Sequence, residues 1–284
     1  MFNMIFENKN GLQLRFGAGY PFTIKEFSGL NPPSATINTT EAALVDGGKY
    51  NSAKLQMRQV NIAFAIEVDA ENNRLEVYKV VQSKMPLKIY YISDRLDVFL
   101  EGYVQDIDFS YFAKKNICTV SVLCPFPYFK VASEVISDFE EGMGLFHFPF
   151  SSTESPQLVF GANYETVAAR VENAGNVPCG LTFKLYASGA VSNPKVIDRK
   201  TGEYFQINID MAAGDQITVE TQQGYKKVSL QQGETITNIY NAWADGSTWL
   251  QLDVNGSTFI YTVGEGSANN LNVEISHYDL FEGV

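Results

Sequence analysis

The chain is 284 residues long, and its 21 basic and 32 acidic residues give a formal net charge of −11. An acidic chain without a basic stripe argues against the wrapping of nucleic acid. The start, MFNMIFENKNG, has no basic n-region, and no stretch of about 18 apolar residues occurs anywhere. We therefore expect a soluble protein that is made in the cytoplasm and enters no membrane.

Charge is divided unevenly along the chain. Residues 1–130 carry 14 basic and 13 acidic residues, whereas residues 131–284 carry 7 basic and 19 acidic residues. Such asymmetry predicts two domains, 1–130 and 131–284, each long enough to bury its own core. The three cysteines include no CxxC pair, and Cys118 and Cys124 lie six residues apart on one strand, roughly 20 Å. That separation excludes a disulfide between them and indicates buried, reduced thiols.

The first domain opens with two short strands within residues 12–27, followed by 29 residues from Ser28 to Gln56 that are rich in turn formers. Connections of this length are uncommon in compact domains and, when ordered, serve function or contact a partner. The segment is interpreted either as an arm that contacts a partner or as a mobile loop. The residues assigned to an inter-subunit arm are Pro33, Asp46, Gly47, Gly48, Tyr50 and Arg58.

The next segments predict an α+β domain dominated by antiparallel sheet. A strand over residues 57–68 is followed by Asp69 as a helix cap and by Leu75, Tyr78 and Val81 at helical spacing. Further strands are expected at residues 88–92 and 98–110. The pattern indicates one amphipathic helix laid on a sheet.

The stretch CTVSVLCPFPYFK, residues 118–130, is predicted to close this domain. Its alternating first half is typical of a half-buried strand. Pro125 and Pro127 then remove two backbone donors, so we expect the chain to leave the sheet there. Tyr128 and Phe129 are too apolar for a free linker, and these four residues are interpreted as a packed inter-domain hinge.

Beyond the hinge, short Gly-punctuated alternating segments predict a β-sandwich of jelly-roll type. Turn residues at Lys200-Thr201-Gly202 and Asn255-Gly256-Ser257 mark hairpin tips. The expected strands lie at residues 157–160, 168–173, 180–187, 195–199 and 203–208 and in QITVET, YKKVSL, WLQLDV, TFIYTV and LNVEISHY.

The residues that could carry chemistry do not form a recognisable site. His147 and His277 are the only histidines, and neither has a partner at catalytic spacing. Asp106 and Asp108, and the Glu140-Glu141 pair, are interpreted as solvated surface carboxylates. We predict a protein that is not an enzyme and has no cofactor and no metal.

Trp243 and Trp249 are the two residues that could stack on a sugar ring. Packing in the core or in a hairpin is the commoner role of such tryptophans. The sequence leaves both readings open.

Several stretches together resemble the distal tail protein (Dit) family of siphophages and their prophages. They include FTIKEFSGLNPP, VDGGKY, LQMRQVNIAF, DRLDVFLEGYVQDIDFSYF and LCPFPYFK in the first half. In the second half they are NAGNVPCGLTFKLYASGAVSNPKVIDRKTGEYFQIN and AAGDQITVETQQGYKKV. The resemblance spans nearly the whole chain and rests on the order and spacing of these stretches.

The resemblance implies a tail-tube-like N-terminal domain whose six copies close into a ring through which DNA passes, with residues 28–56 reaching a neighbouring subunit. It also implies a galectin-like C-terminal domain, which docks other tail-tip proteins. The expected partners are further copies of the chain, the tail tube protein, a tail-tip or tail-associated protein and a receptor-binding protein, all in the virion. A His-x-Asn-x-Arg strand of the kind that galectins use for galactosides is missing from the sequence.

Two other functions remain as alternatives. The first is a host cell-surface adhesin that binds carbohydrate through the C-terminal β-sandwich. The second, weaker one is an enzyme that acts on glycosides.

Overall fold

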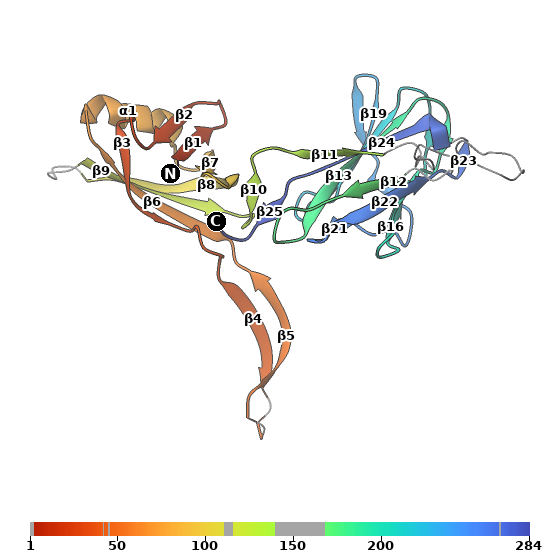
Figure 1. The fold of residues 1–284 in the computed structure, drawn as a ribbon, viewed down its shortest axis with the longest axis horizontal. Coiled ribbons are helices and arrows are strands. Elements are labelled where there is room, and N and C mark those ends of the chain that lie inside the picture. Colours follow the sequence, from red (N-terminus) through yellow and green to blue (C-terminus); the bar gives the residue numbers. More distant parts are fainter. Residues whose placement is uncertain (1–2, 42, 45, 111–115, 140–167, 267) are drawn as a thin grey trace, which may run out of the picture. The chain divides into compact units, whose positions relative to one another are not determined.

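The computed structural model describes residues 3–41, 43–44, 46–110, 116–139, 168–266 and 268–284 (Figure 1). The chain divides into two compact units, Met1–Ala132 together with Leu280–Val284, and Ser133–Asp279. The last five residues thus belong to the first unit, whereas the sequence-based boundary assigned them to the second domain. In chain order, the second unit is an insertion between two segments of the first.

The first unit is a sheet with one helix and a separate hairpin. Its elements are β1 (Asn3–Asn8), β2 (Gln13–Phe16), β3 (Phe22–Ser28), β4 (Ala35–Glu41), β5 (Gly48–Leu55), β6 (Arg58–Ile66), α1 (Ala70–Val80), β7 (Pro86–Ile92), β8 (Asp97–Phe109), β9 (Asn116–Cys124), β10 (Phe129–Val131) and β25 (Leu280–Phe281).

The main sheet of this unit has the strand order β2-β1-β7-β8-β9-β6-β3, and β10 and β25 extend it at one side. Alternate residues of β9, from Cys118 to Cys124, have no exposed surface, because a strand sends successive side chains to opposite faces. Four phenylalanines on β1, β2, β3 and β6 form the aromatic centre of the core, with ring centroids 4.7–5.9 Å apart. They are Phe6, Phe16, Phe22 and Phe64.

Helix α1 packs against β1, β2 and β6. The side-chain amide of Asn8 donates to the Lys79 carbonyl at 3.1 Å, which ties the end of the helix to β1. The buried helix residues are Val77 and Val80, whereas Leu75 and Tyr78, expected on the buried face, are 51% and 37% exposed. Asp69 precedes the helix in a left-handed conformation and makes no capping hydrogen bond through its side chain.

The second unit is almost entirely β. Its elements are β11 (Val135–Asp138), β12 (Ala168–Val171), β13 (Cys179–Ala187), β14 (Val191–Ser192), β15 (Lys195–Asp198), β16 (Tyr204–Gln206), β17 (Asp210–Met211), β18 (Gln216–Glu220), β19 (Lys227–Gln232), β20 (Thr235–Asn238), η1 (Tyr240–Ala242), β21 (Gln251–Leu252), β22 (Ser257–Thr262), β23 (Glu265–Gly266), η2 (Ala268–Asn270) and β24 (Leu271–His277).

Two sheets of this unit pack face to face. One has the order β11-β24-β13-β18-β19-β20 with β21 beside β13, and the other has the order β12-β22-β15-β16. Phe183 on β13 bridges them, with ring centroids 5.0 Å from Phe205 on β16 and 5.6 Å from Phe259 on β22. An aromatic core between two antiparallel sheets is the architecture of a β-sandwich.

The predicted fold class is confirmed as mainly β with antiparallel sheets and one α-helix in the described residues. The strand expected at residues 157–160, His147 and the Glu140-Glu141 pair lie outside the part of the chain that the structure describes.

Candidate functional site

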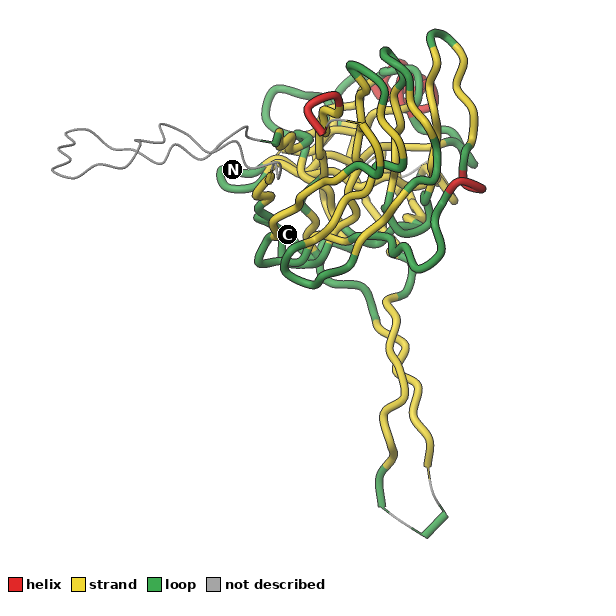
Figure 2. The backbone as a smooth tube through the Cα atoms, turned by 90° about the vertical axis from the view of Figure 1, so that its right-hand side faces the viewer, coloured by secondary structure: helices red, strands yellow, loops and turns green. Residues whose placement is uncertain are grey.

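The most distinctive feature of the first unit is an arm formed by β4 and β5, a two-stranded antiparallel hairpin that pairs with none of the other described strands (Figure 2). Its register runs from Ala35 opposite Leu55 to Glu41 opposite Gly48. Seven pairs of facing residues give a ribbon about 24 Å long, and β5 carries one extra residue where the register shifts between Asn38 and Thr39. The 28–56 segment, interpreted from the sequence as an arm or a mobile loop, thus contains the two paired strands of a hairpin.

Few interactions support this arm within its own chain. Asn38 donates to the Ser52 hydroxyl at 3.0 Å, and Asn51 donates to the Thr40 hydroxyl at 2.7 Å, but both bonds are exposed to water. An isolated two-stranded hairpin is marginally stable in water. The arm therefore has the character of a segment that gains its stability from something packed against it.

Three apolar side chains of the arm are left in water. Ile37 and Tyr50 are each 61% exposed, and Leu44 at the tip is 99% exposed. Ile37 and Thr39 are two residues apart on β4, and Thr39 lies directly opposite Tyr50. Ile37 and Tyr50 consequently share one face of the ribbon, which gives the arm an apolar side.

Arg58, the first residue of β6, fixes the root of the arm. It is 1% exposed, and its guanidinium donates to the carbonyl oxygens of Pro127 at 2.7 Å, Asn31 at 2.7 Å and Glu282 at 2.5 Å, and also to that of Gly29. Burial lowers the pKa of Arg58. The side chain thus joins the loop that leads into the arm, the corner after β9 and the end of the chain.

The Arg58 side chain is enclosed on the remaining sides by close packing. Its guanidinium carbon lies 4.6 Å from the centre of the Phe129 ring, a cation–π distance. Gly29 has φ +97°, and a Cβ there would lie 2.5 Å from the Gln59 carbonyl oxygen. Only glycine fits this position, so the chain entering the arm is held tightly against β6.

The sequence assignment of the arm is corrected in one respect. Pro33, Asp46, Gly47, Gly48 and Tyr50 lie on the hairpin or its approach, and Gly47 adopts φ +87° near the tip. Arg58 was grouped with them, but it is buried and cannot contact a neighbouring subunit. It instead holds the root of the arm in place. The carbonyls that it binds carry no side-chain pattern by which a sequence could have revealed them.

The expected hinge residues form a corner and not an exit. Pro125, Pro127, Tyr128 and Phe129 follow β9, and the chain then returns to the sheet as β10, which pairs with β8 through Lys130 opposite Phe99. β10 also pairs with β25, with Phe129 opposite Phe281. The prolines end β9 as expected, but the chain leaves the first unit only after Ala132.

Trp243 and Trp249 belong to a series of stacked aromatic pairs in the second unit. The Trp243 ring lies 5.5 Å from that of buried Phe205 and 4.4 Å from that of Trp249, which lies 6.1 Å from that of Tyr240. Lys226 Nζ lies 5.3 Å from the centre of the Trp249 ring. Both indole rings thus pack against other aromatic rings. Tyr240, at one end of the series, is 56% exposed.

The described residues offer no assembled catalytic or metal centre. Ser276, His277 and Asp279 are buried, and His277 Nε2 lies 3.2 Å from Asp279 Oδ1. Ser276 and His277 are neighbours on β24 and point to opposite faces, so they form no Ser-His pair. Across the described ranges, no three His, Cys, Asp or Glu side chains gather as metal ligands, and no helix is long and apolar enough to cross a membrane.

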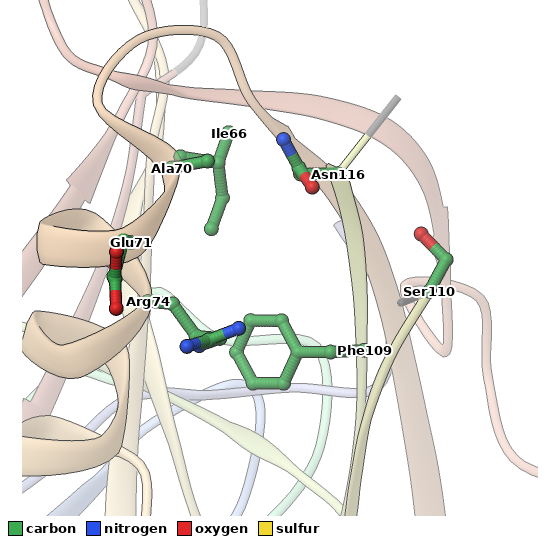
Figure 3. Close-up of a pocket in the computed structure, with 7 residues that line it drawn as sticks. All are labelled: Ile66, Ala70, Glu71, Arg74, Phe109, Ser110 and Asn116. Carbon is green, nitrogen blue, oxygen red and sulfur yellow. The ribbon is translucent and has the colours of Figure 1, made fainter. Parts of the chain in front are cut away.

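One pocket of about 290 Å³ opens at the start of α1 in the first unit (Figure 3). Among the described residues that line it, the charged ones are Glu71 and Arg74, and Arg74 extends beside the ring of Phe109. A single carboxylate and a guanidinium next to an aromatic ring supply neither a nucleophile with its base nor a ligand set. The features that point to a function are the arm and its root.

Residues 174–278 match the family model described as siphovirus-type tail component, C-terminal domain. The fold matches that of SPP1 Dit (gp 19.1), described as a paradigm of the hub adsorption apparatus in Gram-positive infecting phages. The TM-score is 0.69 at 15% identity over 99% of each chain.

Two structures of the phage P2 baseplate in its activated conformation also match, both at 10% identity. The one with Ca gives a TM-score of 0.53 over 100% of this chain and 99% of that chain, and the one with Sr gives 0.51 over 97% and 98%. Among curated proteins, no sequence matches. The resemblance to the distal tail proteins is confirmed, by the family model for residues 174–278 and by the fold for the whole chain.

Proposed function

We propose that this protein is a structural hub in a phage tail tip. Its residues 174–278 match the family model of siphovirus-type tail components. Six copies form a ring that joins the tail tube to the tail-tip complex and lets DNA pass. The fold shared with SPP1 Dit over 99% of each chain supports this role. The protein is built into the virion and works without chemistry of its own.

The observation that carries the proposal is the arm, which pairs with no other strand among the described residues and leaves three apolar side chains exposed. Its exposed Ile37, Leu44 and Tyr50 would each contribute about 1.5–3 kcal/mol if fully buried. A second copy can supply the missing surface, and a head-to-tail contact between identical subunits closes into a ring when the rotation allows it. The expectation of six copies per ring comes from the family resemblance.

The second unit faces outward in this proposal. Residues 131–284 carry 19 acidic against 7 basic residues, so copies of this part repel each other at low salt. Residues 1–130 are nearly neutral, with 14 basic and 13 acidic residues, and can pack closely. The second unit then remains available to tail-tip and receptor-binding proteins.

The ring can be tested by removing the arm cleanly. Gln56 N donates to the Ser34 carbonyl at 2.9 Å, so these two residues stand close enough to be joined by an Asn-Gly turn in place of residues 35–55. We expect the unmodified chain to give one species at six times 31.6 kDa by mass photometry. The arm-less variant should unfold at an unchanged temperature and run as a monomer.

A matched pair of point variants separates arm contact from arm folding. Ile37→Asp adds a negative charge on the apolar side of the ribbon, whereas Asn38→Asp adds the same charge on the opposite side. The first should prevent the ring and the second should leave it intact. A hexameric arm-less variant would refute the role of the arm, and a monomeric native chain retained on a polysaccharide resin would favour the adhesin.

A further inference from the structure

The second unit contains a hollow whose charge is opposite to that of its surroundings. It measures about 440 Å³ and is lined by Arg170, Arg199, Lys200, Asn255, Gly256, Ser257 and Thr258. Three of the seven basic residues in 131–284, including both arginines of that part, therefore meet at one point.

Sheet register explains how the two arginines come together. Arg170 on β12 lies directly opposite Thr258 on β22. On the other side of β22, Arg199 N donates to the Thr258 carbonyl at 2.9 Å, just after the β15 strand. Arg170, Thr258 and Arg199 thus form one row across three neighbouring strands, with about 10 Å between the outer Cα atoms.

The row lies on the outward face of this sheet. The next row, Ala169 opposite Phe259 and Phe259 opposite Asp198, is buried, so the side chains of the arginine row point to solvent. Two guanidinium groups reaching over one threonine can converge on a group held between them. Guanidinium forks suit the oxygen atoms of phosphate and carboxylate groups.

The loops beneath the arginines are held rigidly. Buried Asp198 accepts hydrogen bonds from Lys200 N at 2.8 Å, from the Thr201 hydroxyl at 3.0 Å and from the Ser257 hydroxyl. Gly256 has φ +68°, and a Cβ there would lie 2.5 Å from the Val171 carbonyl oxygen. The floor of the hollow is therefore formed before any ligand arrives, which lowers the entropic cost of binding.

The carboxylates nearby neutralise the hollow only in part. Arg170 pairs with Glu172 at 3.2 Å, but the two side chains are 79% and 77% exposed, so water weakens the pair. Lys200 pairs with Asp253 at 2.8 Å, with both side chains about half exposed. No carboxylate of the described residues pairs with Arg199.

We propose that this hollow binds a single phosphate group, either as the free ion or as an ester on a larger ligand. A compact dianion matches two guanidinium forks and an ammonium group, and the hydroxyl and amide groups of Thr258 and Asn255 suit its remaining oxygens. A continuous polyanion is a poor fit, because the acidic remainder of the unit repels charge beyond the hollow. The site is independent of the proposed ring, since the arm lies in the other unit.

Calorimetric titration of the full chain with inorganic phosphate, at low and constant ionic strength, tests the proposal. We expect saturable binding of one phosphate per chain. Arg199→Gln and Arg170→Gln should each weaken it at least about tenfold. Lys227→Gln removes the same charge outside the hollow and should change the affinity by less than about twofold.

A second titration distinguishes a free phosphate ion from a phosphate ester as the ligand. Glycerol 3-phosphate binding as tightly as inorganic phosphate points to an ester, and binding of inorganic phosphate alone points to the free ion. The proposal is overturned if phosphate does not saturate the chain or if Lys227→Gln weakens binding as much as Arg199→Gln. It is also overturned if a single-stranded oligonucleotide binds more tightly through the same arginines. The variants' unfolding temperatures confirm that each remains folded.

Discussion

Arg58 Nε donates a hydrogen bond to the carbonyl oxygen of Pro127 at 2.7 Å, across 69 residues of sequence. Arg58 begins the strand that follows the arm, and Pro127 lies in the corner between β9 and β10. The bond therefore fixes the root of the arm to the last turn before the chain leaves the first unit. Three further carbonyls, of Gly29, Asn31 and Glu282, complete the arrangement.

Replacing Arg58 by methionine should destabilise the first unit by about 3 kcal/mol or more. The substitution keeps much of the side-chain volume but leaves four partly buried carbonyl oxygens without their donor, and each such loss costs up to about 1–3 kcal/mol unless water replaces it. Urea unfolding of the full chain, followed by a probe in the first unit, measures the loss. Arg95→Met, at an exposed position, is the control and should cost less than about 0.5 kcal/mol. An equal effect of the two variants would contradict the role given to Arg58.

Arg58→Lys tests whether the several donors of the guanidinium group, and not its charge alone, are needed at the root of the arm. A lysine retains the charge but has three donors on one atom and cannot reach carbonyls on several sides at once. We expect a folded chain that fails to form the ring, because the arm root is no longer held in one direction. A lysine variant that assembles as well as the native chain would show that charge alone suffices there.

The three thiols should be inert in the native protein. Burial raises the pKa of Cys118 and Cys179 to about 12, and it raises that of Cys124 to about 12 although Arg58 acts in the opposite sense. A thiol-specific reagent near neutral pH should therefore label none of them until the chain unfolds. In Arg58→Met, Cys124, which lies opposite Arg58 in the sheet, should become the first to react. Rapid labelling of the native chain would be inconsistent with this packing.

Glu101 should make stability depend on pH. Burial alone would raise its pKa, but the hydrogen bond and charge of Lys130, with the charge of Lys88, outweigh burial and lower the pKa. A carboxyl group with a lowered folded-state pKa contributes stability above its unfolded-state pKa, and this contribution is lost as the pH falls through the folded-state value. Because the Glu101 side chain is 44% exposed, we expect a contribution below about 1 kcal/mol at neutral pH.

A double-mutant cycle measures this contribution. Glu101→Gln should lower the free energy of unfolding near neutral pH and cost progressively less as the pH falls below the unfolded-state pKa of a glutamate. In the Lys130→Met background its cost should shrink. A cost that is independent of both pH and Lys130 would assign the effect to packing.

Much of the sheet could be predicted because it is encoded locally. The alternation from Cys118 to Cys124 and from Val60 to Phe64 gives strands whose alternate residues are fully buried. The helix was predicted, but its buried face only in part. Val81 is 1% exposed as expected, whereas Leu75 and Tyr78 are exposed, because only the packed sheet decides which face turns inward. The arm could be located by its composition, whereas its hairpin form depends on exposed polar pairs without a strong period.

The residues that hold the site together could not be predicted. Arg58 binds main-chain carbonyls, and every residue has one, so no side-chain motif marks Glu282 as its partner 224 positions away. Likewise, Arg170 and Arg199 meet only because β22 runs between their strands. Such juxtapositions depend on register between distant strands, which composition and periodicity leave open.

The last five residues of the chain pack into the first unit. Leu280, 2% exposed, and Phe281 form β25 beside β10, and Val284 N donates to the Leu30 carbonyl at 3.2 Å. A Cβ on Gly283 would lie 2.9 Å from Pro32 Cδ, so the tail packs directly under the approach to the arm. A fragment that ends at Ala132 therefore lacks a strand of its own sheet and one acceptor of Arg58.

We expect residues 1–132 alone to be less stable, by about 2–4 kcal/mol, than the same fragment joined to residues 280–284. Because β10 and β25 are antiparallel neighbours, a turn of about four residues can connect them. Urea unfolding compares the two fragments, and the joined fragment with Leu280→Asp is the matched control, expected to resemble the shorter one. The joined fragment should also form the ring without the second unit, because it contains the arm and its complete root. Equal stability of the two fragments would mean that the tail does not support the first unit. A stable joined fragment that stays monomeric would instead indicate that ring closure requires residues 133–279.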